Sequence, residues 1–69
     1  MNTTELVLRV IRTYPENPED GMTISELFRT TEISSHELLQ ALITLRQEGR
    51  IERLGRPGIS EKFYREANL

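Results

Sequence analysis

Residues 34–58 read SSHELLQALITLRQEGRIERLGRPG and contain the clearest structural signals of the chain. Ser34 stands three residues before Glu37, which is the spacing of a capping box at the start of a helix. Four apolar residues follow at intervals that place them on one helical face: Leu38, Ala41, Leu42 and Leu45. Gly49 then provides the left-handed backbone conformation with which helices commonly end. A helix that buries one face and stops at Gly49 is therefore expected.

A short β-ribbon is expected directly after this helix. Residues Arg50 to Leu54 and about Glu61 to Arg65 can pair around the turn Gly55-Arg56-Pro57-Gly58. Phe63 and Tyr64 are neighbours, so they point to opposite faces of a strand and only one of them can be central to the core. The sequence leaves open which one it is.

An amphipathic helix is expected near the beginning of the chain, from about Thr4 to Tyr14. Its apolar stripe consists of Leu6, Val7, Val10, Ile11 and Tyr14. Leu8 lies off this stripe on a helical wheel. Pro15 ends the helix because the residue before a proline disfavours the α region.

A second, shorter helix is expected after a polar loop at residues 15–21. Thr23 and Glu26 have the spacing of another capping box, and residues 22–24 could form a very short strand that leads into the helix. The helix is expected to end at about Thr31. This part of the chain supplies three further residues expected in the core: Leu27, Phe28 and Ile33.

The composition limits the kinds of function to consider. A chain of 69 residues has room for one small domain, residues 1–69, with a modest core. Without cysteine and with a single histidine, it offers no set of metal ligands and no convincing nucleophile and base. We therefore expect no enzyme activity, no catalytic or metal-binding residue, no cofactor and no small-molecule ligand. No apolar run reaches the roughly 18 residues of a membrane helix, and no targeting segment is recognisable, so we expect no membrane partner and a cytoplasmic location.

The charged residues are divided unevenly along the chain, whose net charge is −2. Residues 1–49 contain four basic and eight acidic side chains, whereas residues 50–69 contain five basic and three acidic ones. The expected ribbon is thus the electropositive end of an acidic protein. Such a local field can attract phosphate even when the whole molecule is acidic.

The order of these elements resembles the winged helix-turn-helix superfamily of small transcriptional regulators, over about Leu6 to Arg65. The residues that carry the resemblance are Thr23-Ile24-Ser25-Glu26-Leu27, then Leu38, Leu42 and Leu45, then Glu48-Gly49-Arg50-Ile51-Glu52-Arg53. The turn at residues 55–58 and the segment Lys62-Phe63-Tyr64-Arg65 look like a wing and its return strand. The resemblance implies a mainly α fold with a small β-ribbon, that is, three helices plus a two- or three-stranded wing.

In that superfamily the second helix of the motif enters the DNA major groove, which implies double-stranded DNA as the partner and an association with the nucleoid. Here that helix has His36, Gln40 and Ile43 on the face opposite its leucine stripe. Gln40 could read adenine, Ile43 could touch a thymine methyl group, and hydroxyls at the helix start could reach a phosphate. The expected DNA contacts are Ser34, Ser35, His36, Gln40, Ile43, Arg53, Arg56 and Lys62, with Arg56 at the tip of the wing.

A protein-binding function is the alternative that the sequence leaves open. The expected recognition helix has one basic residue, Arg46, and it lies to one side. Leu39 and Ile43 form an apolar patch where polar side chains would be expected, and such patches often mark protein contacts. The domain would then be an adaptor or an antagonist of a DNA-binding protein, with Leu8, Leu39 and Ile43 at its interface. For the DNA-binding function, a homodimer on a symmetric site is expected, formed through Leu8 and the first helix or through Tyr64 to Leu69.

Overall fold

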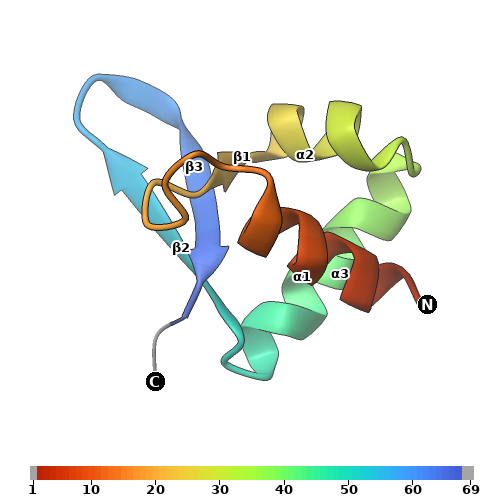
Figure 1. Cartoon of the computed structure of the whole chain (residues 1–69). Helices are drawn as coiled ribbons and strands as arrows, with labels where there is room; N and C mark the ends of the chain where they lie inside the picture. Colours follow the sequence, from red (N-terminus) through yellow and green to blue (C-terminus); the bar gives the residue numbers. More distant parts are fainter. Residues whose placement is uncertain (1, 68–69) are drawn as a thin grey trace.

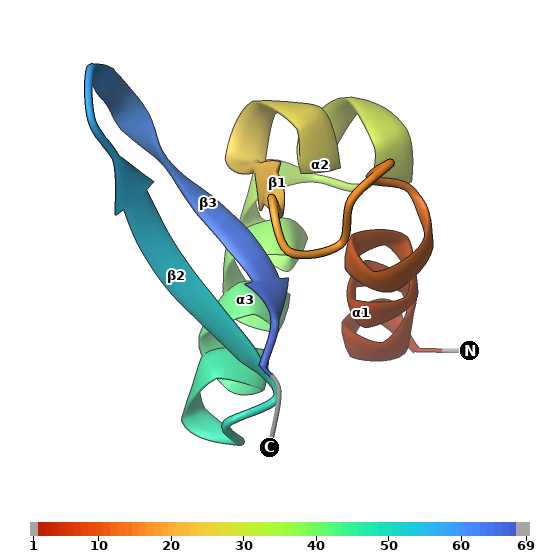
Figure 2. The same cartoon turned by 60° about the vertical axis from the view of Figure 1, so that its left-hand side comes forward.

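The computed structural model describes residues 2–67 and contains three helices and a three-stranded antiparallel sheet. The helices are α1 (Thr3–Thr13), α2 (Ile24–Thr31) and α3 (Ser35–Gln47). The strands are β1 (Met22–Thr23), β2 (Ile51–Arg56) and β3 (Ile59–Glu66), and β3 lies between the other two. Figures 1 and 2 show the helices gathered beside the sheet, with the β2–β3 ribbon extending beyond them. This arrangement is consistent with a winged-helix layout.

The limits of α3 agree with the sequence prediction. The Glu37 backbone N–H donates to the Ser34 hydroxyl oxygen at 3.2 Å, which caps the first turn. The four residues of the predicted stripe are at most 3% exposed and lie in the core: Leu38, Ala41, Leu42 and Leu45. Gly49 follows with a φ of 72°, a left-handed conformation that other residues resist. The buried stripe thereby determines which side chains α3 turns outward.

The buried face of α1 is wider than its apolar stripe predicts. Asn2 caps the helix by accepting the Glu5 backbone N–H at 2.8 Å, and α2, α3 and β3 all pack against it. Because three elements surround the helix, Leu8 is drawn into the core and is only 3% exposed. The prediction that Leu8 lies off the buried stripe is therefore wrong, and Leu8 offers almost no surface to a partner. Tyr14, which was expected in the stripe, follows the last turn and is 64% exposed.

The start of α2 has the predicted capping box, in which Thr23 and Glu26 each accept the other's backbone N–H. The helix has two turns and buries Leu27 completely. Phe28, one residue further and about 100° round the helix, is 45% exposed. The prediction of a buried Phe28 is wrong because so short a helix is covered on one face only. Ile33, in the turn before α3, packs against the core as predicted.

Tyr64, and not Phe63, is the aromatic residue that joins the core. Tyr64 is 5% exposed and lies opposite Met22 in β1 and Arg53 in β2. Its burial removes it from the predicted dimer surface at Tyr64 to Leu69, of which residues 68 and 69 lie outside the described part of the chain.

Both strands of the ribbon extend closer to the turn than predicted, and their register shifts between residues 54 and 56.

This register divides the side chains of the β2–β3 ribbon between two faces. Directly opposite residues of antiparallel strands share a face, and successive residues alternate. The inner face, which packs toward the helices, carries Ile51, Arg53, Lys62 and Tyr64. The outer face carries Glu52, Arg56, Phe63 and Arg65.

A glycine is required where the loop between α1 and β1 meets β3. Gly21 has a φ of 76°, and a Cβ atom there would lie 2.7 Å from the Tyr64 carbonyl oxygen. No side chain can be accommodated at that distance from backbone. The loop therefore runs close along β3, within reach of the side chains on the outer face of the ribbon.

Candidate nucleic-acid interface

The outward face of α3 brings together the side chains that the sequence predicts as base contacts. His36, Gln40 and Ile43 are exposed and spaced four and three residues apart, so they follow one another along one side of the helix. Gln47 is exposed four residues after Ile43 and continues the row. Leu39, beside this row, is 46% exposed and Ile43 is 44% exposed. The face therefore combines amide, imidazole and apolar groups.

The two serines at the start of α3 differ in what their hydroxyl groups can do. The Ser34 hydroxyl accepts the Glu37 N–H and donates to the Glu37 carboxylate, each at 3.2 Å. Ser35 is exposed beside it, at the positive end of the helix dipole. Ser34 is thus engaged in holding the helix start, and Ser35 is the better placed of the two to meet a phosphate.

A groove between α3 and β2 joins the outward face of α3 to the ribbon. It has a volume of about 490 Å³ and is lined by Ile43, Arg46, Gln47, Ile51, Glu52 and Arg53. Ile43 and Arg53, which the sequence places in separate elements, thus share one surface. Arg46, which lies at the edge of the predicted face, belongs to this surface as well. Arg53 reaches it because its place opposite Tyr64 puts it on the inner face of the ribbon.

The cations on this side of the ribbon are not neutralised by neighbouring carboxylates. Within residues 2–67, no carboxylate oxygen lies within 4.0 Å of the charged groups of Arg46, Arg53 or Lys62. The acids next to them are engaged elsewhere. Glu52 pairs with an arginine of the outer face, and Glu61 accepts a hydroxyl of α2 at 2.8 Å. Arg46, Arg53 and Lys62 thus lie on this surface without an ion-pair partner in the described part of the chain, and the Glu52 carboxylate that also lines the groove pairs with Arg65.

Arg56 lies on the opposite side of the ribbon from this groove. Its guanidinium donates to the Asp20 carbonyl oxygen at 2.6 Å and lies 4.8 Å from the centre of the Phe63 ring. The tip of the turn is formed by Pro57 and Gly58 instead. The expectation that Arg56 projects from the tip is wrong, because the side chain folds back on the chain. A DNA contact by Arg56 stays a prediction.

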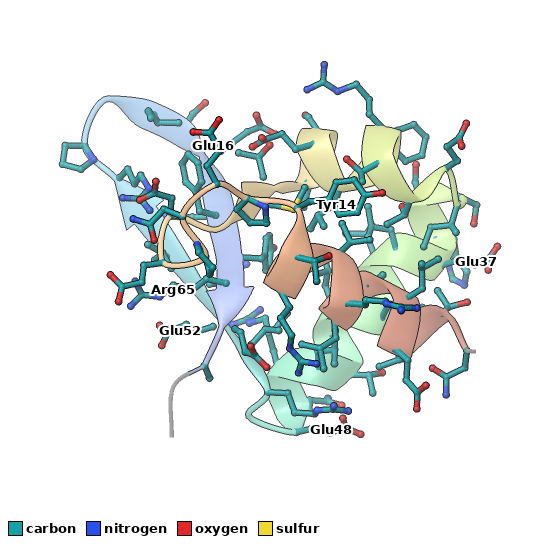
Figure 3. All side chains as sticks on the ribbon, in the orientation of Figure 1. Tyr14, Glu16, Glu37, Glu48, Glu52 and Arg65 are labelled. Carbon is teal, nitrogen blue, oxygen red and sulfur yellow. The ribbon has the colours of Figure 1, made fainter. Side chains whose placement is uncertain are left out.

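Arg65 is held on the outer face in a similar way. It forms an ion pair with Glu52, and its guanidinium donates to the Glu19 carbonyl oxygen at 3.1 Å. Figure 3 shows Glu52 and Arg65 side by side on the ribbon, far from Glu37 at the start of α3. Together Arg56 and Arg65 tie residues 19–20 of the loop to the ribbon. The arginines of the outer face therefore stabilise the fold, whereas Arg46 and Arg53 beside α3 form no such contacts with the loop.

A second groove, between α2 and α3, is lined mainly by apolar groups. Its residues are Ile24, Ser25, Phe28, Ser35, Leu38 and Leu39. Phe28 and Leu39 each leave nearly half of their surface exposed there. The sequence pattern predicts the exposure of Leu39 but not that of Phe28, for which the short length of α2 is the available signal. The apolar surface of α3 thus extends toward α2, and the predicted interface residue Leu8 has no part in it.

Comparison with known proteins does not assign the chain to a family. No protein-family model matches the sequence, and a search of curated proteins found no match. Among residues 2–67, no helix has both the length and the apolar character needed to span a membrane, and no three acidic or histidine side chains are grouped to hold a metal ion. The function is therefore inferred from the surface that α3 and the ribbon form.

Proposed function

We propose that this protein is a DNA-binding regulator of the winged-helix type, with α3 in the major groove and the β2–β3 ribbon against the backbone or the minor groove. The observation that carries the proposal is the groove between α3 and β2, where exposed residues of α3 meet Arg46 and Arg53. An α-helix fits the width of the major groove. Cations beside such a helix are needed because neutralisation of phosphates supplies much of the affinity.

The side chains on this surface suit the two kinds of contact that a DNA-binding protein makes. The amide of Gln40 offers a donor and an acceptor, which match N7 and N6 of adenine. Ser35 and His36 stand in the first turn of α3, where the helix dipole favours a phosphate. Arg46, Arg53 and Lys62 would contact the backbone, which positions the protein without reading the sequence.

The small number of cations predicts weak binding by a single copy. Each phosphate that the protein neutralises contributes about −0.9 to the slope of log K against log salt. Arg46, Arg53 and Lys62 would therefore give a shallow slope. Two copies on a symmetric site would increase the affinity, as in other helix-turn-helix proteins.

The test is a fluorescence-anisotropy titration of a mixed-sequence duplex at about 50 mM and about 200 mM salt. Arg46→Ala and Arg53→Ala should each weaken binding at low salt and reduce the salt slope by about one. Arg9→Ala removes the same charge from the exposed side of α1 and should bind like the parent protein. Absence of binding by the folded parent protein at low salt would rule out this function.

A protein-binding function is the second candidate, and the exposed apolar side chains favour it. Phe28, Leu39 and Ile43 leave between 44% and 46% of their surface exposed on adjoining parts of α2 and α3. Surfaces of this kind often mark protein contacts. The same titration separates the two functions, because an adaptor or antagonist should bind no duplex at low salt. In that case Arg46→Ala and Arg53→Ala would leave the binding of the partner protein unchanged.

A further inference from the structure

The exposed side chains of α3 have a chemistry that suits one kind of base pair. We propose that α3 selects A·T-rich DNA, with Leu39 and Ile43 in contact with thymine methyl groups in the major groove. The inference rests on the proposed DNA-binding function and extends it to the class of site that is bound.

The row formed by His36, Gln40, Ile43 and Gln47 on the outward face of α3 contains no arginine, lysine or carboxylate. Guanine is read mostly by arginine or lysine, and cytosine by a carboxylate. Arg46 lies beside this row, in the groove that it shares with Arg53. The one carboxylate of α3, Glu37, accepts the Ser34 hydroxyl at 3.2 Å and serves the helix cap.

The spacing of Leu39 and Ile43 suits contact with two methyl groups. They stand four residues apart on the same side of α3, which separates them by about 6 Å along the helix axis. Stacked base pairs are about 3.4 Å apart, so the two side chains can reach pairs about two steps from each other. The C5-methyl of thymine is the apolar group that the major groove presents. Contact with it removes apolar surface of both molecules from water.

The polar neighbours of this apolar pair match the other base. Adenine, the partner of thymine, presents an N6 donor and an N7 acceptor, which a glutamine amide can bind together. Gln40 follows Leu39 directly, and Gln47 lies one turn beyond Ile43. Both bases of an A·T pair therefore find a matching group on α3.

The surroundings of Ile43 favour DNA over an apolar protein surface as the occupant. Ile43 shares its groove with Arg46 and Arg53, neither of which has a carboxylate partner among residues 2–67. Apolar side chains next to unpaired arginines match the floor of a DNA groove flanked by phosphates. An apolar protein surface would leave those charges without a partner and partly desolvated.

The experiment compares duplexes of equal length that differ in the methyl groups of the major groove. The parent protein is titrated with an A·T-rich duplex, with the same duplex carrying uracil in place of thymine, and with a G·C-rich duplex with or without 5-methylcytosine. One lost methyl contact corresponds to about fourfold in affinity, so loss of both should weaken binding by roughly fifteenfold. We expect the thymine duplex to bind most tightly and 5-methylcytosine to improve binding of the G·C-rich one.

Variants assign the effect to the two side chains. Leu39→Ala and Ile43→Ala should each reduce the ratio of affinities for the thymine and uracil duplexes, and the double variant should abolish it. Tyr14→Ala is the control for loss of an exposed apolar side chain, because Tyr14 is 64% exposed after the last turn of α1, outside the surface formed by α3 and the ribbon. It should keep the full ratio. Circular dichroism establishes that each variant is folded.

Different results overturn the inference and the proposed function. Equal affinity of the parent protein for the thymine and uracil duplexes would overturn the inference while leaving DNA binding intact. A ratio that persists in the folded double variant would overturn the assignment to Leu39 and Ile43. Failure of the parent protein to bind any duplex at low salt would overturn the proposed function itself.

Discussion

The two faces of the β2–β3 ribbon carry similar cations in different surroundings. On the outer face, Arg56 and Arg65 donate to carbonyl oxygens of the loop at residues 19–20, and each also contacts a carboxylate. On the inner face, Arg53 and Lys62 have no carboxylate partner among residues 2–67. A count of charges along the chain does not distinguish these residues. Their position relative to Tyr64 in the sheet distinguishes them, because it determines the face of the ribbon on which each side chain lies.

We propose from this difference that the outer face stabilises the fold and that the inner face binds DNA. An arginine whose hydrogen bonds are satisfied within the chain must give them up before it can contact a phosphate. An arginine without such bonds has no intramolecular hydrogen bond to break when it binds. Changes on the outer face should therefore be detected by unfolding, and changes on the inner face by titration with DNA.

The largest effect is expected where the loop meets the outer face, at Gly21. Gly21→Ala places a Cβ 2.7 Å from the Tyr64 carbonyl oxygen, on a residue whose φ is 76°. The left-handed conformation alone costs about 1–2 kcal/mol, and the contact with backbone adds to it. We expect a loss of about 2–4 kcal/mol in the free energy of unfolding, measured by urea denaturation.

Gly49→Ala is the matched control for this change. Gly49 has a similar φ of 72°, but a Cβ there would meet nothing within 4 Å. Only the conformational cost of about 1–2 kcal/mol should appear. Equal losses at both positions would show that the loop does not press against β3.

Arg56→Ala should have the next largest effect. It removes a hydrogen bond to Asp20 at 2.6 Å and the contact with the Phe63 ring. Because the side chain is about one-third exposed, we expect a loss of only about 1 kcal/mol in the free energy of unfolding. Faster amide hydrogen exchange in residues 15–21 should accompany it. An Arg56→Ala protein that is as stable as the parent but binds DNA poorly would mean that Arg56 on the outer face contributes to DNA binding and not to stability.

Arg53→Ala should show the opposite pattern on the inner face. Its exposed side chain makes no ion pair among the described residues, so the free energy of unfolding should change by less than about 0.5 kcal/mol. The salt slope of DNA binding should fall by about one, as for the loss of one phosphate contact. A marked loss of stability without a change in slope would contradict the assignment of the inner face to binding.

Local signals in the sequence predicted much of the fold and part of the candidate site. The cap at Ser34, the leucine stripe and Gly49 lie within one helix, and they determine its limits and its outward face without help from distant residues. The burial of Leu8 could not be predicted, because it depends on three elements that pack around α1. The contact between Arg56 and Asp20 joins residues 36 positions apart and leaves no local pattern. Whether Phe63 or Tyr64 is buried also depends on distant residues, because Tyr64 lies opposite Met22 and Arg53 in the sheet.

The smallest effect is expected at the ion pair that joins the end of β3 to α1. The Arg12 guanidinium donates from Nε to both carboxylate oxygens of Glu66 at 3.1 Å, and this hydrogen bond lowers the pKa of Glu66 below its ordinary value of 4.5. A carboxyl group whose pKa is lowered by folding stabilises the protein above its ordinary pKa, and the contribution disappears as the pH falls through the lower, folded value. The pKa of Arg12 is raised by the same contact, and its titration lies far above this range.

Glu66→Gln should therefore be slightly less stable than the parent protein at pH 7, and the difference should close as the pH is lowered from about 4.5 toward 3. Urea midpoints of both proteins across this range measure it. Glu16→Gln, in the exposed loop, serves as the control for the loss of one negative charge. A difference that stays constant down to pH 3 would mean that the effect of the substitution does not depend on the charge of Glu66. The ion pair would then have no part in holding α1 to the sheet.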